Sequence, residues 1–324
     1  MNSEASEVSL VDVIMTCFNE GAYIGEAVRS VLNQTRADLI ASIVIADDGS
    51  AAETIAVLKD IETWDSRIKV IHGTGGKGIS SQRNMAIAGT SAGWIALLDG
   101  DDVWLEEKLD RQLAATYGRP EVGLVYTDFS VFPGTDASSA RRAGVLDITG
   151  QEDLVTAYFL NDPPIIPSTV LMSRKAFGAA GGFDTSVKVF EDTDFYLRTA
   201  RHCRFAVVNE SLLLKRLHSA SVTGNGKNLM GHHALVAFKA ASSHPHLLQL
   251  VPKRLSERAR KLGNQSFLSS RRAEAINYLG LSVKLDRGNI RAWMALITAQ
   301  YFPGIALRLL GKDGRRRRSS LGIS

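Results

Sequence analysis

Short apolar runs alternate with amphipathic stretches along the first third of the chain. Each run has the length of a buried strand, and each is followed, after a polar turn, by apolar residues at helical spacing. The four runs are Leu10–Thr16, Ala41–Ala46, Ile68–His72 and Ala92–Leu98. Repeated strand, turn and helix units predict an α/β fold: a Rossmann-like, mostly parallel sheet flanked by helices.

Acidic residues gather directly after the fourth run. Asp99, Asp101 and Asp102 lie within four positions, and Gly100 between them allows the backbone to turn. Carboxylates this close repel one another and need a counter-charge. Mg2+ or Mn2+ suits them, because these ions prefer oxygen ligands and leave positions open for phosphate oxygens. The alternative is an acidic loop, or a helix cap formed by Asp102 with acids in the first helical turn.

Two other strand ends also carry polar clusters. The first run ends in C-F-N-E (17–20), and the second ends in D-D-G-S (47–50). Asp47 and Asp48 can accept hydrogen bonds from a base N–H or a ribose hydroxyl, although a plain Asp-Gly turn explains them too. Ligands of open α/β sheets bind beyond the carboxyl ends of the strands, so the three clusters together predict a nucleotide-and-metal site.

The region after the third run excludes two common phosphate-binding motifs. The glycine-rich loop 73–78 lacks the spacing of a P-loop, and no G-x-G-x-x-G follows the first run. The predicted helix Ile79–Gly89 carries Arg83 and Asn84 on its first turns. Arg83 can pair with a diphosphate or with the acids of the next strand end, and an ordinary surface arginine is the alternative.

The second half of the chain predicts further strands and helices. The expected strands are Val122–Val131, Thr169–Ser173 and Ala206–Leu214, and the expected helices are Leu105–Tyr117, Leu154–Leu160 and one from Arg174. The stretch 163–169 contains three prolines, which argues against helix there.

A Glu191-Asp192 pair opens a helical pattern over Phe190–Arg198. Adjacent like charges raise one another's pKa, and a carboxylate poised in this way can remove a proton from a hydroxyl group as a general base. The alternative is an acidic helix N-terminus that the helix dipole stabilises.

The chain changes character near residue 230. We predict one domain over 1–230 and a helical region over 231–324, with helices Leu255–Phe267, Arg272–Leu285 and Ile290–Leu310. From Pro252 to Arg318 there are 16 Lys and Arg against 4 Asp and Glu, whereas the whole chain has a net charge of only +4. This placement does not suit a nucleic-acid groove but suits an anionic membrane surface; a solvated basic tail is the alternative.

The apolar segment 292–307 is too short as a helix to span a bilayer, so we expect peripheral membrane association. Packing of these helices against the first domain is the alternative. The N-terminus is polar and acidic, unlike a signal peptide, and Cys17 and Cys203 form neither a disulfide framework nor a metal-ligand spacing. We therefore expect a cytoplasmic location, with the protein peripheral on the cytoplasmic face of the membrane.

Four motifs in order carry a family resemblance: T-C-F-N-E, I-A-D-D-G-S, S-S-Q-R-N-M-A and L-L-D-G-D-D. They resemble family 2 glycosyltransferases of the GT-A fold, over about residues 8–220. The resemblance implies an inverting transfer of a sugar from a nucleotide donor, expected to be a UDP-sugar, to a hydroxyl of a glycan or lipid-linked acceptor. It also implies a divalent cation, Mn2+ or Mg2+.

The resemblance assigns roles to residues of this chain. It places the catalytic base at Asp192 within the Glu191-Asp192 pair, and the metal at Asp101 with Asp99 and His218 nearby. In one nucleotide-binding set we expect Phe18, Asn19, Glu20, Asp47, Asp48, Arg83, Asn84 and Asp99. Lys215 and Arg216 are candidates to stabilise the leaving diphosphate.

Two other functional classes compete with this interpretation. A sugar nucleotidyltransferase can use a similar sheet, but it would be expected to carry a glycine-rich phosphate signature near its N-terminus, where T-C-F-N-E-G stands. A catalytically silent scaffold that binds a sugar nucleotide would not need Asp99, Asp101 and Asp192 intact.

Overall fold

The structure is a computed structural model that describes residues 10–217 and 229–307. The chain divides into two compact units. The sheet unit comprises residues up to 154 together with 163–217, and the helical unit comprises 155–162 together with the residues from 218 onward. The predicted division at residue 230 did not include the segment 155–162 in the helical part.

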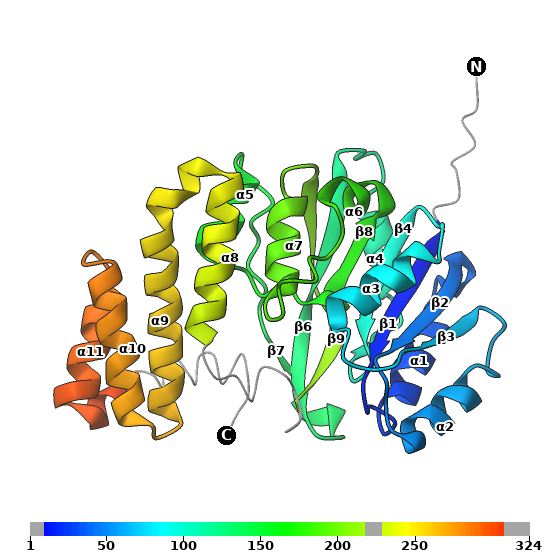
Figure 1. Ribbon diagram of the computed structural model, residues 1–324, viewed down its shortest axis with the longest axis horizontal. Coiled ribbons are helices and arrows are strands. Elements are labelled where there is room, and N and C mark those ends of the chain that lie inside the picture. The colour runs from blue at the N-terminus through cyan, green and yellow to red at the C-terminus, as the bar shows by residue number, and fades with distance from the viewer. Residues whose placement is uncertain (1–9, 218–228, 308–324) are drawn as a thin grey trace. The chain divides into compact units, whose positions relative to one another are not determined.

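The sheet unit is built on one nine-stranded sheet (Figure 1). Its strand order is β3 (Ile68–His72), β2 (Ile40–Asp47), β1 (Val11–Cys17), β4 (Trp94–Asp99), β8 (Val170–Ser173), β6 (Val122–Pro133), β9 (Arg204–Leu217) and β5 (Val103–Trp104), with β7 (Arg141–Arg142) paired to β6. The pairs from β3 to β4 are parallel, as is β6 with β9. β8 runs antiparallel between β4 and β6, so the sheet is mixed in its second half.

Alternating residues of the first strands face two different layers. Val13 and Met15 of β1 share one core with helices α1 (Ile24–Leu32), α2 (Ala52–Ile61) and α4 (Lys108–Ala114). α3 (Ile79–Ala88) packs against β1 and β2 from the other face. Figure 1 shows α3 in front of the sheet together with α6 (Arg174–Ala180) and α7 (Glu191–Thr199). The prediction of an α/β fold with flanking helices is confirmed, and the sheet itself is mixed, because the pairs made by β8, β5 and β7 are antiparallel.

Two local predictions around the acidic turn are wrong. Asp102 is not a helix cap, because its carboxylate is buried against Ser168 and the backbone of Arg216, and the short strand β5 follows it directly. The helix expected over Leu105–Tyr117 is therefore shorter. The proline-rich segment, where no helix was expected, contains a 3-10 turn, Pro167–Thr169. The turn can form because Pro167 is at its first position, where a backbone N–H has no partner within the turn.

The helical unit contains most of α5 (Leu154–Asn161), then α8 (Leu229–Ser243), a 3-10 turn (Pro245–Leu250), α9 (Val251–Leu268), α10 (Arg272–Leu285) and α11 (Ile290–Tyr301). α9 and α10 approach closely at Gly263, where a Cβ would lie 2.7 Å from Leu279. The single helix expected over Ile290–Leu310 ends instead at Tyr301, and a new helical segment begins at Pro303. Within the described parts of the chain, the helices are all too short or too polar to cross a bilayer.

Candidate active site

The parallel register of β1, β2 and β4 brings three strand ends together. Cys17 pairs with Asp47, and Thr16 pairs with Asp99. The turn after β1 is tied to the turn after β2, because Asn19 donates its N–H to Ser50 Oγ (2.8 Å) and accepts from the N–H of Ala51 (2.8 Å). Asn19 makes both contacts from a left-handed conformation (φ 58°), which asparagine tolerates better than most residues.

The two acids that follow β2 have different surroundings. Asp47 is fully buried, and its carboxylate accepts from the N–H and the hydroxyl of Ser50. Asp48 is half-buried and accepts from the backbone N–H groups of Lys77 (3.2 Å) and Gly78 (3.1 Å), and from Gln82 Nε2 (2.7 Å). The Asp48 carboxylate therefore orders the glycine-rich loop after β3.

An aromatic side chain stands at the open edge of this cluster. Phe18 follows β1 directly and is 57% exposed, among the largest exposed fractions of an aromatic ring in the sheet unit's described residues. An exposed ring beside strand-end carboxylates offers a flat apolar face to a base or a sugar.

The acidic turn after β4 is held by residues that are far away in sequence. Ser168 accepts from the N–H of Asp99 (3.1 Å) and donates to the Asp102 carboxylate (2.7 Å). Arg216 donates to the carbonyl of Asp101 (3.0 Å) through its side chain and to Asp102 (3.1 Å) through its backbone. Gly100 is required here for space, because a Cβ would overlap the Glu20 carboxylate and lie 2.9 Å from the Thr16 carbonyl oxygen.

Negative charge accumulates at this turn beyond what the neighbouring residues neutralise. Burial, followed by the Asp101, Asp99 and Asp102 carboxylates, raises the pKa of Glu20 to about 9. One carboxylate oxygen of Glu20 is buried and has no hydrogen-bond partner among residues that the structure describes. Burial likewise raises the pKa of Asp102 to about 7, against the pull of Lys215.

Lys215 supplies one positive charge within this acidic group. Its Nζ lies 3.9 Å from an Asp102 carboxylate oxygen. The carboxylates of Asp102, then Asp99 and Asp101, raise the pKa of Lys215, so its amine is held protonated. Arg216 differs, because it is almost fully buried and its guanidinium is shared among Asp101, Gly134 and Glu26. These contacts commit the Arg216 guanidinium to holding the acidic turn, and a role for Arg216 at the diphosphate stays a prediction.

Arg83 joins the acidic turn to the start of α7. It is only 2% exposed and donates to Asp99 Oδ1 (2.8 Å) and to Glu191 Oε1 (2.9 Å). Although burial opposes it, the charges of Asp99 and Glu191 raise the pKa of Arg83. The sequence predicted that Arg83 pairs either with a diphosphate or with the acids of the next strand end. The structure shows the pair with Asp99, at the end of β4.

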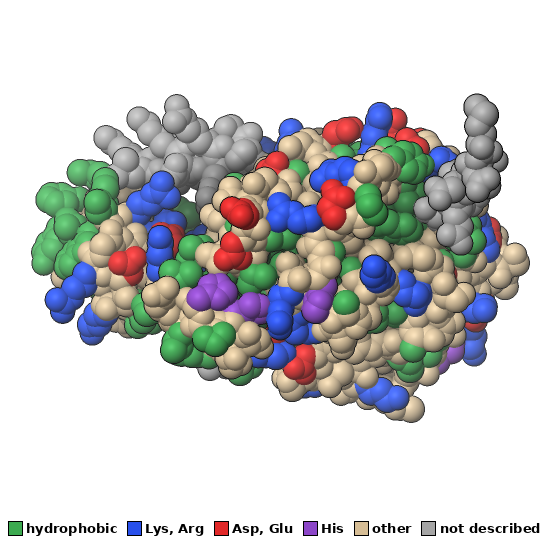
Figure 2. Space-filling view, turned by 90° about the horizontal axis from the view of Figure 1, so that it is seen from above, with side chains coloured by type: hydrophobic (Ala, Val, Ile, Leu, Met, Phe, Trp, Pro, Cys, Tyr) green, Lys and Arg blue, Asp and Glu red, His purple; other side chains and the backbone are tan. Residues whose placement is uncertain are grey.

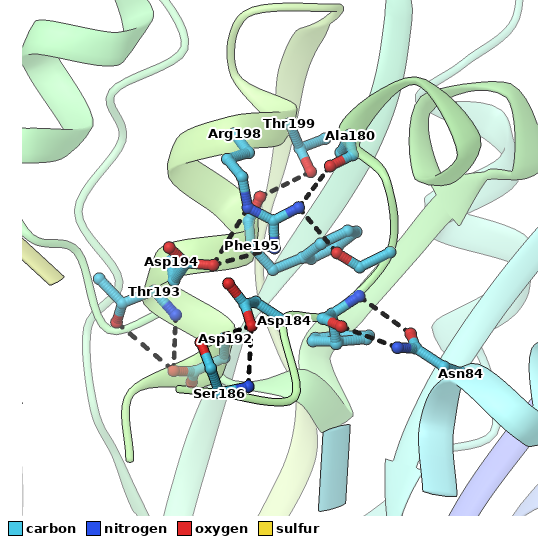
Figure 3. Close-up of polar contacts among 12 residues, drawn as sticks. Asn84, Ala180, Asp184, Ser186, Asp192, Thr193, Asp194, Phe195, Arg198 and Thr199 are labelled. Atoms are coloured by element: carbon cyan, nitrogen blue, oxygen red, sulfur yellow. Dashed lines mark hydrogen bonds and ion pairs between the residues drawn. The ribbon is translucent and has the colours of Figure 1, made fainter. Parts of the chain in front are cut away.

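The three acids in the first turn of α7 are not equivalent. Glu191 pairs with Arg83, and Asp194 pairs with Arg198 at 2.9 Å. Asp192 has no ion pair among the described residues, and one of its oxygens accepts from the Thr193 N–H at 2.6 Å (Figure 3). Burial and then the neighbouring Glu191 raise the pKa of Asp192 to about 7. Asp192 is thus the carboxylate of this turn that can exchange a proton near neutral pH.

The turn before α7 is fixed to α3 and to α7 itself. Asn84 donates to the carbonyl of Phe183 (2.7 Å) and accepts from its N–H (2.9 Å), as Figure 3 shows. Arg198 donates to the carbonyls of Ala180 and Gly182. Because its amide is committed to this turn, we expect Asn84 to shape the turn rather than to contact a nucleotide.

Metal ligands remain a prediction at this site. Over residues 10–217 and 229–307, no group of three or more acidic, histidine or cysteine side chains is arranged to hold a metal ion. His218, expected to be near the metal, lies outside the described residues. The excess carboxylate charge around Asp101 nevertheless suits a divalent cation that takes one or two protein carboxylates and completes its shell with phosphate oxygens.

Several residues that organise the site carry no signal in the sequence. Ser168 lies in a proline-rich stretch and contacts the acidic turn across 66 positions. Ser50 and Gln82 lie within two of the four motifs, but no role was predicted for either of them. Phe190 precedes α7 in a left-handed conformation (φ 63°), which no local pattern suggested.

Acidic side chains at the strand ends of a GT-A sheet are typical of enzymes that use sugar nucleotides. Comparison with known proteins identifies the family. The sequence model of Glycosyl transferase family 2 matches residues 12–180, so the chain belongs to that family.

Individual relatives agree with this assignment. The chain is 33% identical over 122 residues to the Escherichia coli protein UDP-Glc:alpha-D-GlcNAc-diphosphoundecaprenol beta-1,3-glucosyltransferase WfgD, covering 38% of this chain and 46% of the relative. It is 36% identical over 104 residues to the putative teichuronic acid biosynthesis glycosyltransferase TuaG of Bacillus subtilis, covering 32% and 40%. The chain thus matches less than half the length of each of these two.

A solved structure shows the same fold over most of the chain. The S. aureus TarS 1-349 structure in complex with UDP-GlcNAc superposes with a TM-score of 0.61 at 16% identity, covering 95% of this chain and 92% of TarS 1-349. The GT-A fold implied by the four sequence motifs is confirmed.

Proposed function

We propose that this protein is an inverting, metal-assisted glycosyltransferase that moves a sugar from a UDP-sugar to a hydroxyl group, with Asp192 as the general base. The observation that carries the proposal is the unequal pairing of the acids that begin α7. Glu191 and Asp194 are neutralised by arginines, whereas Asp192 is not, and its pKa is raised to about 7.

The donor is expected to lie across the ends of β1, β2 and β4. Phe18, Asn19 and Glu20 would line the nucleotide, with Asp48 or Asp47 near the base and Asp99 near the ribose. Two named relatives support uridine: TarS was solved with UDP-GlcNAc, and the name of WfgD specifies UDP-Glc. Arg83 would hold Asp99 in place for the ribose instead of touching the nucleotide.

Asp101, with Asp99 nearby and His218 as a further candidate, would hold the divalent cation. When bound, the cation would supply positive charge to the diphosphate as it departs. The raised pKa of Glu20, to which the Asp101, Asp99 and Asp102 carboxylates contribute, supports this assignment. A cation beside these carboxylates would relieve their mutual repulsion. Lys215 would add a second, permanent positive charge to the same region.

Asp192 would take the proton from the acceptor hydroxyl as the oxygen attacks the anomeric carbon. The new C–O bond forms on the face opposite the diphosphate, and the old anomeric C–O bond breaks, so the configuration inverts. Glu191 would act on Asp192 through its charge, because its own carboxylate is bound to Arg83. One displacement completes the transfer, with no covalent sugar–enzyme intermediate.

The acceptor class follows from the relatives alone. The name of WfgD specifies an acceptor sugar on diphosphoundecaprenol, and that of TuaG refers to teichuronic acid biosynthesis. We therefore propose a glycan or lipid-linked acceptor and a role in assembling a polysaccharide.

The experiment that tests the proposal is a donor screen. Purified protein is incubated with UDP-, GDP- and dTDP-sugars in the presence of Mn2+ or Mg2+, and the released nucleoside diphosphate is measured. Release from a UDP-sugar that is lost in Asp101→Asn, but kept in Asp110→Asn at a half-buried position of α4, is the expected result. If no donor is hydrolysed and no nucleotide raises the Tm, the proposal is wrong and a silent scaffold fits better.

The pH dependence of turnover follows from Asp192. The base works only when ionised, and burial with Glu191 raises its pKa to about 7. We expect kcat to rise about fivefold from pH 6 to pH 7 and about tenfold in all from pH 6 to pH 8, and then to level off. A pH–rate profile at saturating donor and metal measures this, and a rate that is flat from pH 5 to 8 would contradict the assignment.

A further inference from the structure

Helix α11 in the helical unit exposes its large apolar residues and buries its small ones. Its inner face is formed by the buried Ala292 and Ala299, which face the neighbouring helices α9 and α10. Its outer face carries five large side chains that are each 42–71% exposed. These residues, here called the apolar stripe, are Ile290, Trp293, Met294, Ile297 and Tyr301. A surface helix of a globular protein ordinarily shows the reverse arrangement.

The apolar stripe is continuous along the helix. Its members recur every three or four residues, with Trp293 and Met294 as one adjacent pair, so they lie on one side of α11. Exposed Phe302, Ile305 and Leu307 extend it beyond the end of the helix. Figure 2 shows hydrophobic side chains gathered at the end of the helical unit, with Lys and Arg side chains beside them. A contiguous exposed apolar patch of this kind marks an interaction surface.

The charges around the apolar stripe are mainly positive, with Asp286 as the acid that stands just before the helix. α11 contains one charged residue, Arg291, and no acid. Arg287 and Lys284 are exposed just before the helix. In the sequence that follows the described residues, Arg308, Lys312 and the four arginines 315–318 stand against a single acid, Asp313.

We propose that the apolar stripe of α11 docks on an anionic phospholipid surface, with the helix lying in the plane of the interface. Apolar residues on one face and basic residues at its margins are the features of interfacial helices. Trp293 and Tyr301 belong to the residue types that favour the headgroup level. At 12 residues, α11 would be about 18 Å long, too short to span the hydrocarbon core.

Charge argues against a second copy of the chain as the occupant. In a two-fold symmetric contact each patch meets itself. Because α11 contains no acid, a second copy joined along the apolar stripe would offer Arg291 no opposite charge from its own α11. Lipid phosphates complement these charges instead. The proposal rests on the helical unit alone and does not depend on the chemistry proposed for the sheet unit.

Vesicle binding by the full chain tests the proposal. Sedimentation is measured with vesicles of equal parts phosphatidylcholine and phosphatidylglycerol, and with phosphatidylcholine alone. The protein is expected to bind the anionic vesicles. The double variant Ile290→Gln/Ile297→Gln should lower the affinity for anionic vesicles by about 10²-fold, because two large side chains no longer enter the interface. Arg287→Gln/Arg291→Gln should weaken binding about fivefold per charge.

A matched control distinguishes binding through the apolar stripe from nonspecific binding by other exposed apolar residues. Leu235→Gln/Leu248→Gln removes two similarly exposed apolar residues of the helical unit that lie off α11, and it should bind like the unmodified chain.

Trp293 is the single tryptophan of the chain after residue 104, so its fluorescence should shift to the blue on anionic vesicles and be quenched by brominated acyl chains. Trp293→Phe should remove that response.

Three outcomes would overturn the proposal. The first is the absence of binding to anionic vesicles. The second is equal binding by the Ile290→Gln/Ile297→Gln variant, which would place the contact elsewhere. The third is that the chain binds no vesicles but forms a dimer in light scattering, and that this variant is a monomer. The apolar stripe would then be the contact surface for a second copy.

Discussion

Asp192→Asn is expected to lower kcat by about 10²–10⁴-fold, the usual contribution of a general base. Asparagine has almost the same shape and can still accept the N–H of Thr193, so the start of α7 should keep its structure. The amide cannot take up a proton from the acceptor. The affinity for the donor should stay within about twofold, because Asp192 is expected to face the acceptor. Single-turnover kinetics with the identified donor, together with a donor titration, measure both quantities.

Asp194→Asn is the matched control for this variant. Asp194 lies in the same helical turn, but it is almost fully buried and paired with Arg198. Its replacement should lower the free energy of unfolding and leave kcat of the folded protein nearly unchanged. If Asp194→Asn loses kcat and Asp192→Asn does not, the base has been assigned to the wrong residue.

Arg83→Met should damage both stability and activity. Arg83 is nearly fully buried and is the shared partner of Asp99 and Glu191. Removing it leaves two largely buried carboxylates uncompensated, a change that typically costs about 3–5 kcal/mol. In the protein that remains folded, Asp99 and the start of α7 lose their common anchor. Misplacement of a site by about 1 Å can cost about 10²-fold, so we expect kcat/KM to fall by that order.

Urea unfolding and steady-state kinetics separate the two effects when Arg174→Met is measured alongside. Arg174 is a partly buried arginine that pairs with Asp12 (2.8 Å). It also donates to the backbone carbonyls of Ala92, just before β4, and Ile87 in α3, away from the strand ends of the site. Arg174→Met should lose stability to a similar extent and keep its kcat/KM. An Arg83→Met protein with unchanged kcat/KM per folded molecule would show that Arg83 is only structural.

The sheet was predictable because its strands are encoded by local pattern. The runs Leu10–Thr16 and Ile68–His72 match β1 and β3 to within one residue, since buried parallel strands need continuous apolar segments with polar ends. The clustering of Asp47 and Asp99 at one edge follows from parallel register alone. Local pattern therefore suffices to predict that these acids lie at one edge of the sheet.

The support of the site was not predictable from local pattern. Ser168 reaches the acidic turn because β8 inserts antiparallel between β4 and β6, a topology that no short motif specifies. Arg83 finds Glu191 across 108 positions. The helix around 290–310 was overextended because apolar spacing continues through Pro303, while the backbone breaks there. Contacts between distant segments decide such features, and a single sequence does not contain them.

The anomeric configuration of the first-formed product tests the central claim most directly. In the absence of an acceptor, water can take the sugar, and proton NMR at early times distinguishes the released anomers before they equilibrate. With an α-linked UDP-sugar, the β-anomer should appear first, and it should be lost with Asp192→Asn. Initial release of the α-anomer would contradict a single displacement with inversion and, with it, the role assigned to Asp192.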